Sequence, residues 1–465
     1  MAVSAAQAQR KRPNIVWIMA DDLGYADVGC YGQKMIRTPN IDRLAAEGML
    51  FTQAYSGCTV CAPSRSVLMT GKHMGHTSIR SNPGGVPILE SDFTVAEMLK
   101  QAGYATGGFG KWGLGDMGTE GTATKQGFDE FYGYLHQAHA HFYYPGVLID
   151  NDHETPLSGN VDDKKTTYSA DSIADRALSF IRKNKDRDFF CYMPFTIPHT
   201  ELVVPEDSLV PYRGVVKEGP PQGKPNDRLE YQKEPYATYA GMVSRLDGYI
   251  GRVMALLKEL NLDRDTIVFF TSDNGGATRL WNDREYFKSY VGPNGVDMRG
   301  HKQNFYEGGI RVPMIARWPG RIAAGGTSDF AWMFQDFFPT AAELAGTKVP
   351  AGLDGFSVLP TLLGRKQKPH EFLYWEQPRY LGAATGEFRK EKPIGALRMG
   401  DWKAVRAKPD AALEVYNLRD DLGEQTDLAA KRTDLVAKFE AKMAAEHIEP
   451  RKQTEPPHRW WKTKY

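Results

Sequence analysis

Short apolar runs alternate along the chain with longer amphipathic stretches. Residues 14–20, 189–195 and 266–272 are near-continuous apolar runs, typical of strands buried within a parallel sheet, and residues 104–109 and 312–318 are strand-like. Between these runs, apolar positions recur at helical spacing and predict helices over residues 94–102, 167–183, 235–259 and 328–345. The alternation of strand and helix predicts an α/β fold in which helices sandwich a large, mostly parallel sheet.

The pattern changes after residue 364. Short strands with close turn signals are predicted there, followed by one helix, at residues 371–377, 394–399, 402–406, 414–418 and 434–447. Such a segment predicts a small α+β unit, an antiparallel sheet with one packed helix. We therefore divide the chain into an N-terminal tail (1–11), a large α/β domain (12–367) and a C-terminal α+β subdomain (368–465).

Composition excludes several classes of partner. The 465 residues include 58 Lys and Arg against 57 Asp and Glu, so the formal net charge is +1. This balance gives no support for binding to nucleic acid or to a membrane surface, because both normally need a basic face. No run of roughly 18 apolar residues occurs, so we expect no transmembrane segment.

The first residues suggest export. Residues 2–8 contain Ala6-Gln7-Ala8, which resembles the end of a secretory signal peptide whose apolar segment has been removed. A periplasmic or secreted protein is the resulting expectation, and a short disordered tail is the alternative.

Oxygen-rich pairs follow two of the predicted strands. Asp21-Asp22 comes directly after residues 14–20, and Asp273-Asn274 directly after residues 266–272. In open α/β sheets, sites form at the carboxyl ends of the strands. If the two strands are neighbours, three carboxylates and one amide converge, and such a cluster favours a hard cation such as calcium or magnesium. The alternative is that these side chains cap turns, as Asp often does after a strand.

A cysteine precedes a predicted helix at residues 63–69. Pro63 suits the first turn of that helix, so Cys61 lies just ahead of an N-terminus that attracts anions. Arg65 adds a planar fork suited to a tetrahedral oxyanion. The pair Cys58 and Cys61 lacks the second C-x-x-C of a zinc ribbon. A thiolate nucleophile is possible, but soft sulfur is poorly matched to an oxygen cluster.

The segment 61–71, CAPSRSVLMTG, matches the signature C-x-P-S-R-x-x-x-x-T-G and resembles the type I sulfatases, arylsulfatase-like members of the alkaline phosphatase superfamily. Further blocks resemble that family in the expected order along nearly the whole chain. They are Asp21-Asp22, Gly110-Lys111-Trp112, Pro198-His199, Ser272-Asp273-Asn274-Gly275-Gly276, and Lys302 ahead of Glu307-Gly308-Gly309.

The resemblance implies a specific chemistry. In this family the motif cysteine is oxidised to formylglycine (3-oxoalanine), whose aldehyde hydrates to a geminal diol. One hydroxyl, held on a calcium ion, attacks sulfur and releases the alcohol, and deprotonation of the other then expels sulfate. Cys61 would be that residue, and a formylglycine-generating or an anaerobic sulfatase-maturating enzyme would be its partner.

The resemblance also implies a role for each matching residue. One calcium ion would be held by the modified Cys61 together with Asp21, Asp22, Asp273 and Asn274. Arg65 would steady the diol, Lys111 and Lys302 would clamp sulfate oxygens, and His199 would protonate the leaving alcohol.

One position departs from the family pattern. Many relatives carry a histidine two residues after the lysine that corresponds to Lys111, whereas this chain has Gly113. We hypothesise that His139 or His141 enters the site and takes over or contacts substrate; the alternative is that both lie outside it. Arg80 and Asn82 are further candidates for binding the alcohol portion of the substrate.

The expected reaction is hydrolysis of sulfate monoesters, with sulfated carbohydrates as the substrates. Two alternatives stay open: a phosphate or phosphonate monoester hydrolase on the same scaffold, and an inactive homologue that binds sulfated glycans. Sulfate and phosphate esters share a tetrahedral shape, so a single pocket can accept both.

Overall fold

The computed structural model describes residues 12–160, 164–224, 231–277, 284–382 and 384–455. The predicted tail and its signal-like residues 6–8 lie outside this part of the chain. Among the described residues, no helix combines the length and the apolar character that crossing a membrane requires.

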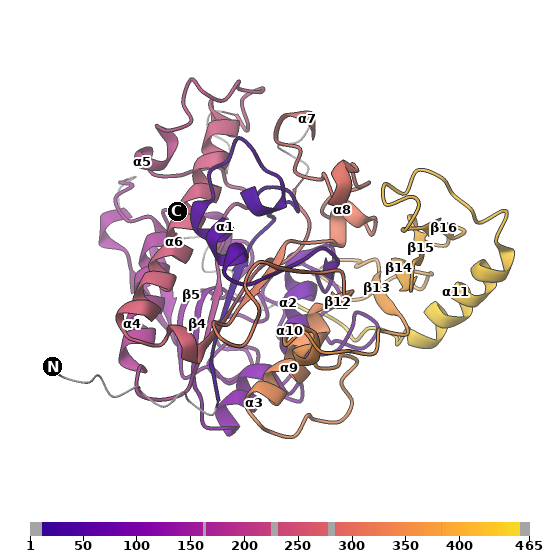
Figure 1. The fold of residues 1–465 in the computed structure, drawn as a ribbon, viewed down its shortest axis with the longest axis horizontal. Helices are drawn as coiled ribbons and strands as arrows, with labels where there is room; N and C mark the ends of the chain where they lie inside the picture. Colours follow the sequence, from indigo (N-terminus) through magenta and orange to yellow (C-terminus); the bar gives the residue numbers. More distant parts are fainter. Residues whose placement is uncertain (1–11, 161–163, 225–230, 278–283, 383, 456–465) are drawn as a thin grey trace.

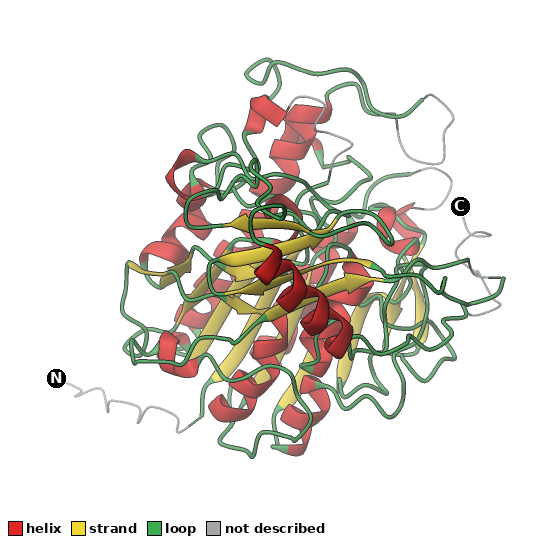
Figure 2. Ribbon diagram, turned by 90° about the vertical axis from the view of Figure 1, so that its right-hand side faces the viewer, coloured by secondary structure: helices red, strands yellow, loops and turns green. Residues whose placement is uncertain are grey.

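A ten-stranded sheet runs through the larger part of the molecule (Figure 1, Figure 2). Its five central strands are parallel, in the order β9 (Thr266–Ser272), β1 (Asn14–Ala20), β8 (Phe189–Pro194), β4 (Ala105–Lys111) and β5 (Glu130–Tyr134). The sheet is extended by β10 (Met314–Arg317), β2 (Met49–Phe51) and β11 (Gly326–Ser328) beyond β9, and by β6 (Val147–Asp150) and β7 (His153–Pro156) beyond β5. The predicted large, mostly parallel sheet is confirmed.

Helices cover both faces of this sheet. Successive side chains of the central strands point to opposite sides, and both sets are apolar, so each face needs a covering layer. On β1, Ile15 and Trp17 belong to one apolar core, and Val16 and Ile18 belong to another. The first core includes α2 (Cys61–Thr70), α3 (Val95–Gln101) and α9 (Phe337–Leu344), and the second includes α1 (Pro39–Ala46), α4 (Ser169–Lys183) and α6 (Pro235–Glu259). The shorter helices are α5 (Glu206–Leu209), α7 (Arg284–Phe287), α8 (Glu307–Ile310) and α10 (Leu359–Leu362).

The helix predicted over residues 328–345 is wrong in its first half. The segment instead ends β11, forms the short strand β12 (Trp332–Met333) beside β3 (Ala54–Tyr55), and becomes α-helical only at Phe337. Asp336 accepts a hydrogen bond from the Met333 backbone N–H at 2.9 Å, just ahead of that helix. Pairing with a strand distant in the sequence therefore outweighs the local helical periodicity.

The C-terminal part forms the predicted small α+β unit, at the right of Figure 1. Four antiparallel strands lie in sequence order, and helix α11 (Thr433–Glu446) packs against them through Phe439 and Met443. The strands are β13 (Leu373–Gln377), β14 (Ile394–Met399), β15 (Trp402–Arg406) and β16 (Glu414–Asn417). The division of the chain at residues 367 and 368 stays a prediction.

A buried ionic network ties this small sheet to the rest of the molecule. Lys403 on β15 lies 2.8 Å from the carboxylates of both Glu307 and Glu424, and all three side chains are fully buried. Glu307 also pairs with Arg311 at 2.7 Å. Since Lys403 is the cation that the two carboxylates share, its removal leaves a buried negative charge without compensation.

We therefore predict that Lys403→Met lowers the free energy of unfolding by about 3 kcal/mol or more, because removing one member of a buried ion pair leaves the other charge buried and uncompensated. Urea denaturation followed by circular dichroism measures this loss. Lys392→Met is the matched control, since Lys392 pairs with Glu440 at the surface, where such a pair is worth about 1 kcal/mol or less. Equal effects of the two substitutions would contradict the prediction.

Candidate active site

The two oxygen-rich pairs meet at one edge of the sheet. Strands β1 and β9 are parallel neighbours whose last residues, Ala20 and Ser272, lie in register. The Asp22 backbone N–H donates to the Asp273 carboxylate at 3.1 Å, and the Asn274 amide donates to the Asp22 carboxylate at 2.7 Å. The structure thus brings Asp21, Asp22, Asp273 and Asn274 together, all of them buried.

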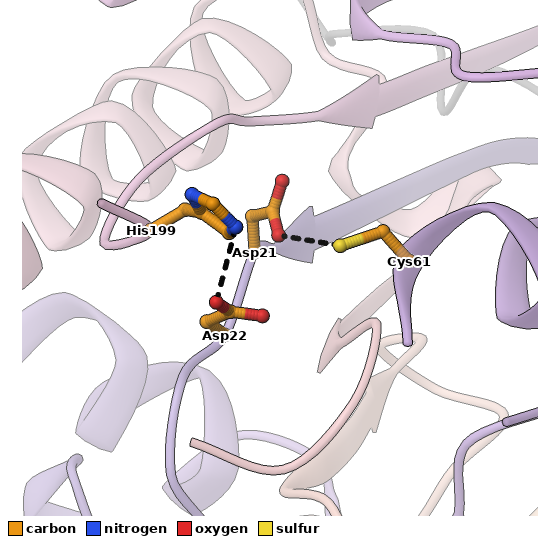
Figure 3. A group of neighbouring side chains, drawn as sticks. All are labelled: Asp21, Asp22, Cys61 and His199. Atoms are coloured by element: carbon orange, nitrogen blue, oxygen red, sulfur yellow. Dashed lines mark hydrogen bonds and ion pairs between the residues drawn. The ribbon is translucent and has the colours of Figure 1, made fainter. Parts of the chain in front are cut away.

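Helix α2 delivers Cys61 to the same point. Val60 is extended, the helix begins at Cys61, and all ten of its residues are buried. The Cys61 thiol lies 3.4 Å from an Asp21 carboxylate oxygen (Figure 3). At the opposite end, Gly71 adopts φ 67°, a left-handed conformation that glycine allows without strain. The helix is thus anchored at both ends, with its N-terminus against the carboxylates.

Three cations compensate the buried carboxylates. Lys111, the last residue of β4, donates to Asp21 at 2.6 Å, and Lys302 donates to Asp22 at 2.8 Å. Lys302 also lies 3.4 Å from the Cys61 sulfur. Arg65, one turn into α2, bridges Asp273 at 2.9 Å and Asp21 at 3.3 Å. All three cations predicted for the site therefore lie within it.

These contacts shift the pKa values of the acidic groups in different directions. Burial alone would raise the pKa of Asp21, but the charges of Lys111, His199 and Arg65 outweigh it and hold that pKa well below its usual range. Asp273 has fewer compensating charges, so burial and then the Asp21 charge raise its pKa to about 6. Burial, followed by the Asp21 charge, also raises the pKa of the Cys61 thiol well above its usual range.

His199 faces the cluster from the loop after β8. Its Nε2 lies 3.2 Å from the Asp22 carboxylate (Figure 3), and its Nδ1 donates to the Thr200 carbonyl oxygen. Burial lowers the pKa of His199 to about 4, while the attraction of Asp22 opposes that shift. The imidazole is therefore fixed in orientation, with Nε2 directed at the site.

The structure separates the two histidines proposed to replace the side chain missing at Gly113. His141 stacks on His199 with ring centres 4.6 Å apart and lines the pocket beside the cluster. His139 is fully buried and packs edge-on against Tyr134, with ring centres 4.8 Å apart. His141 reaches the site, whereas His139 belongs to the surrounding core.

A residue that the sequence analysis did not single out fills the space at Gly113. A side chain carbon built there would lie 2.3 Å from the Gln137 amide nitrogen. Gln137 is 5% exposed, and neither polar atom of its side chain has a hydrogen-bond partner within the described residues. No local sequence pattern marks Gln137. The packing shows that its side chain occupies the space that a larger residue at position 113 would need.

The structure also separates Arg80 from Asn82. Asn82 lines the pocket and accepts a hydrogen bond from the Ala62 backbone N–H at 3.1 Å. Arg80 instead ion-pairs with Glu376 at 2.5 Å and lies outside the set of described residues that line the pocket. The Arg80 guanidinium is therefore held by a buried carboxylate from the C-terminal sheet, and the structure does not bring it together with the other predicted site residues.

The site opens into a pocket of about 890 Å³. Asp22, His141, His199 and Lys302 lie at its inner end. The outer wall comes from the end of β13 and the segments that follow β13 and β15, including Gln377, Pro378, Arg379, Tyr380, Lys408 and Pro409. Both parts of the chain therefore shape the space in front of Cys61.

Comparisons with known proteins agree with this architecture. The sulfatase family matches residues 13–347, and the C-terminal family of N-sulphoglucosamine sulphohydrolase matches residues 300–451. Human arylsulfatase A is 34% identical over 430 residues, which cover 87% of this chain and 76% of the relative. Canine N-acetylgalactosamine-6-sulfatase is 31% identical over 408 residues, which cover 81% and 71%.

A similar solved structure is that of Ps i-CgsB in complex with k-i-k-neocarrahexaose, with a TM-score of 0.78, 29% identity and 96% coverage of both chains. The phosphonate monoester hydrolase of Agrobacterium radiobacter shares the fold, with a TM-score of 0.67, 21% identity and coverage of 94% and 95%. With the family matched over most of the chain, the predicted hydrolysis of sulfate esters is confirmed at the level of the family. The chain belongs to the sulfatase family.

Proposed function

We propose that the protein removes sulfate from sulfated carbohydrates, using a nucleophile made from Cys61 and one calcium ion held by Asp21, Asp22, Asp273 and Asn274. One observation carries this proposal. The first residue of α2 lies 3.4 Å from both an Asp21 oxygen and the Lys302 ammonium, so position 61 faces a cluster of oxygen ligands and a sulfate-binding cation together.

Calcium suits the donors in this cluster. Three carboxylates and an amide are hard oxygen ligands, which calcium prefers. The Asn274 side-chain oxygen is buried and accepts no hydrogen bond within the described residues. A buried oxygen of that kind costs free energy unless a partner satisfies it, and a cation would do so. His199 and Cys61 also lie within the group, but its other donors are carboxylate oxygens, whereas zinc sites are usually built from several His or Cys ligands.

The raised pKa of the Cys61 thiol argues that the unmodified side chain is a poor nucleophile. The thiol stays protonated at neutral pH because burial and the Asp21 charge disfavour the thiolate. Formylglycine at position 61 would supply a hydrated aldehyde as an oxygen nucleophile, and calcium would polarise it and the sulfate group. Arg65 supports this arrangement by bridging Asp21 and Asp273, and its guanidinium also donates to the Lys111 carbonyl oxygen.

The remaining residues handle charge and protons. Lys111 and Lys302 project their ammonium groups beside position 61, where they would bind sulfate oxygens and neutralise the charge that develops on them. His199 would deliver a proton from Nε2 to the leaving alcohol oxygen, since its Nδ1 proton is held by Thr200. Asp22, 3.2 Å from Nε2, opposes the burial that lowers the pKa of His199 to about 4, and a bound sulfate ester would add a second negative charge that favours the protonated imidazole.

A carbohydrate substrate fits the pocket and the relatives. The pocket of about 890 Å³ carries polar walls from Asn82, Gln303 and Gln377. Relatives include enzymes named for a sugar sulfate, and one similar structure holds an oligosaccharide. We further propose export to the periplasm or medium, supported by the signal-like residues 6–8, and maturation of Cys61 by a formylglycine-generating or anaerobic sulfatase-maturating enzyme.

The first test concerns the nucleophile. Protein produced with a maturating enzyme should hydrolyse 4-nitrophenyl sulfate, and Cys61→Ala should lower kcat/KM by about 1,000-fold or more, as expected when a nucleophile is lost. Cys30→Ala is the matched control, since Cys30 lies beside Asp42 and is not among the described residues that line the pocket. Intact-mass measurement should show the parent lighter than its encoded mass, since formylglycine replaces the sulfur by oxygen and has two fewer hydrogens.

The same assay with 4-nitrophenyl phosphate measures the alternative reaction. A kcat/KM for the phosphate above that for the sulfate would reject sulfate esters as the preferred substrates. A fully active preparation in which Cys61 is unmodified would contradict the proposal that formylglycine is the nucleophile.

The second test concerns the metal. Calcium added to chelator-treated protein should raise Tm, because a ligand at 100 times its Kd adds about 2.7 kcal/mol to the free energy of unfolding. Asp273→Asn should reduce that rise, while Asp186→Asn, the same change at an exposed carboxylate, should leave it intact. Stabilisation by zinc but not by calcium or magnesium would contradict the proposed oxygen site.

The third test separates the two histidines. His141→Ala should lower kcat/KM for 4-nitrophenyl sulfate by about ten-fold or more, the range expected when a contact worth about 1.4 kcal/mol is lost. His139→Ala should instead lower Tm and leave kcat/KM unchanged, since His139 packs against Tyr134 in the core. His153→Ala, at an exposed position, controls for the substitution itself. Normal kcat/KM in both His139→Ala and His141→Ala would show that neither histidine serves the reaction.

A further inference from the structure

Two cations stand at the outer wall of the pocket. Arg379 follows β13 by two residues, and Lys408 follows β15 by two residues. Strands β13 and β15 are both antiparallel to β14, which lies between them, so they run in the same direction and end at the same edge of the sheet. Because Arg379 and Lys408 both line the pocket, that edge faces the site.

Neither side chain is neutralised by the protein. Within the described residues, no carboxylate pairs with Arg379 or Lys408, and both are exposed. Several other cations of the same unit are paired: Arg389 with Glu391 at 3.2 Å, Arg406 with Glu440 at 2.8 Å, and Lys452 with Glu387 at 2.8 Å. Arg379 and Lys408 differ from these in that they line the pocket and have no carboxylate partner within the described residues.

The rest of the pocket does not offset this charge. Asp22 is the one carboxylate among the described residues that line it, and Asp22 already pairs with Lys302 at 2.7 Å. A sulfate ester held by Lys111 and Lys302 would occupy the inner end and leave the outer wall for other parts of the substrate. Positive charge without a protein partner favours an anionic group at that wall.

We propose that Arg379 and Lys408 form a subsite for a second anionic group, a sulfate or a carboxylate, on the same sugar chain as the ester that is hydrolysed. This inference rests on the proposed function, because it assumes that a sulfate ester fills the inner end. It makes the substrate a carbohydrate with at least two negative charges, and it assigns part of the specificity to the C-terminal sheet.

Binding to the Cys61→Ala protein in the presence of calcium tests the subsite without turnover. Isothermal titration calorimetry would compare sucrose octasulfate, which carries many sulfates, with glucose 6-sulfate, which carries one. The double variant Arg379→Gln with Lys408→Gln should weaken octasulfate binding about ten-fold or more and glucose 6-sulfate binding less than about three-fold, with the difference shrinking at high salt. Arg365→Gln with Lys366→Gln removes the same charge from exposed positions outside the pocket and should change neither affinity.

Equal weakening of both probes, no weakening of either, or failure of the parent to bind octasulfate would overturn the subsite. A disaccharide with one sulfate and one hexuronate carboxylate distinguishes the two sources of charge. If the double variant weakens its binding as well, the subsite accepts carboxylates; if only octasulfate is affected, the subsite is a sulfate site. Loss of 4-nitrophenyl sulfate hydrolysis in the matured parent would reject the proposed function alone, since the binding comparison does not depend on turnover.

Discussion

Three carboxylates buried at the ends of two adjacent strands are the constraint that organises this molecule. Charges of one sign at such short range are not stable in a protein interior without compensation. Arg65, Lys111 and Lys302 provide it, each from a different element of the fold. The need for balance therefore fixes helix α2, strand β4 and the Lys302 loop around a single point.

The C-terminal sheet takes part in that arrangement rather than standing beside it. Its strands end at the pocket, and Lys403 locks β15 to Glu307 in the larger part of the chain. A wall attached through buried charges keeps its position relative to the inner site, so the distance between the two ends of the pocket is set by the fold. Under the proposed subsite, such a fixed distance would favour ligands whose two anionic groups have a matching separation.

Much of this site could be predicted from the sequence, because its residues follow strong local signals. Apolar runs that end in Asp21 and Asp273 predict carboxylates at the end of a sheet, and the helix that begins at Cys61 follows from Pro63. The rest depended on contacts between distant residues. Arg80 pairs with Glu376, 296 residues away along the chain. The pairing of β12 with β3 keeps residues 328–336 from forming the predicted α-helix.

The burial of Cys61 limits when the proposed modification of this side chain can take place. Its side chain is 1% exposed and sits at the start of a helix whose every residue is buried. An enzyme that makes the proposed formylglycine would have no access to this side chain once α2 has packed, so the modification would have to precede folding. Folding and the proposed maturation would then compete for the newly made chain, and the rate at which α2 docks would decide how much of the protein becomes active.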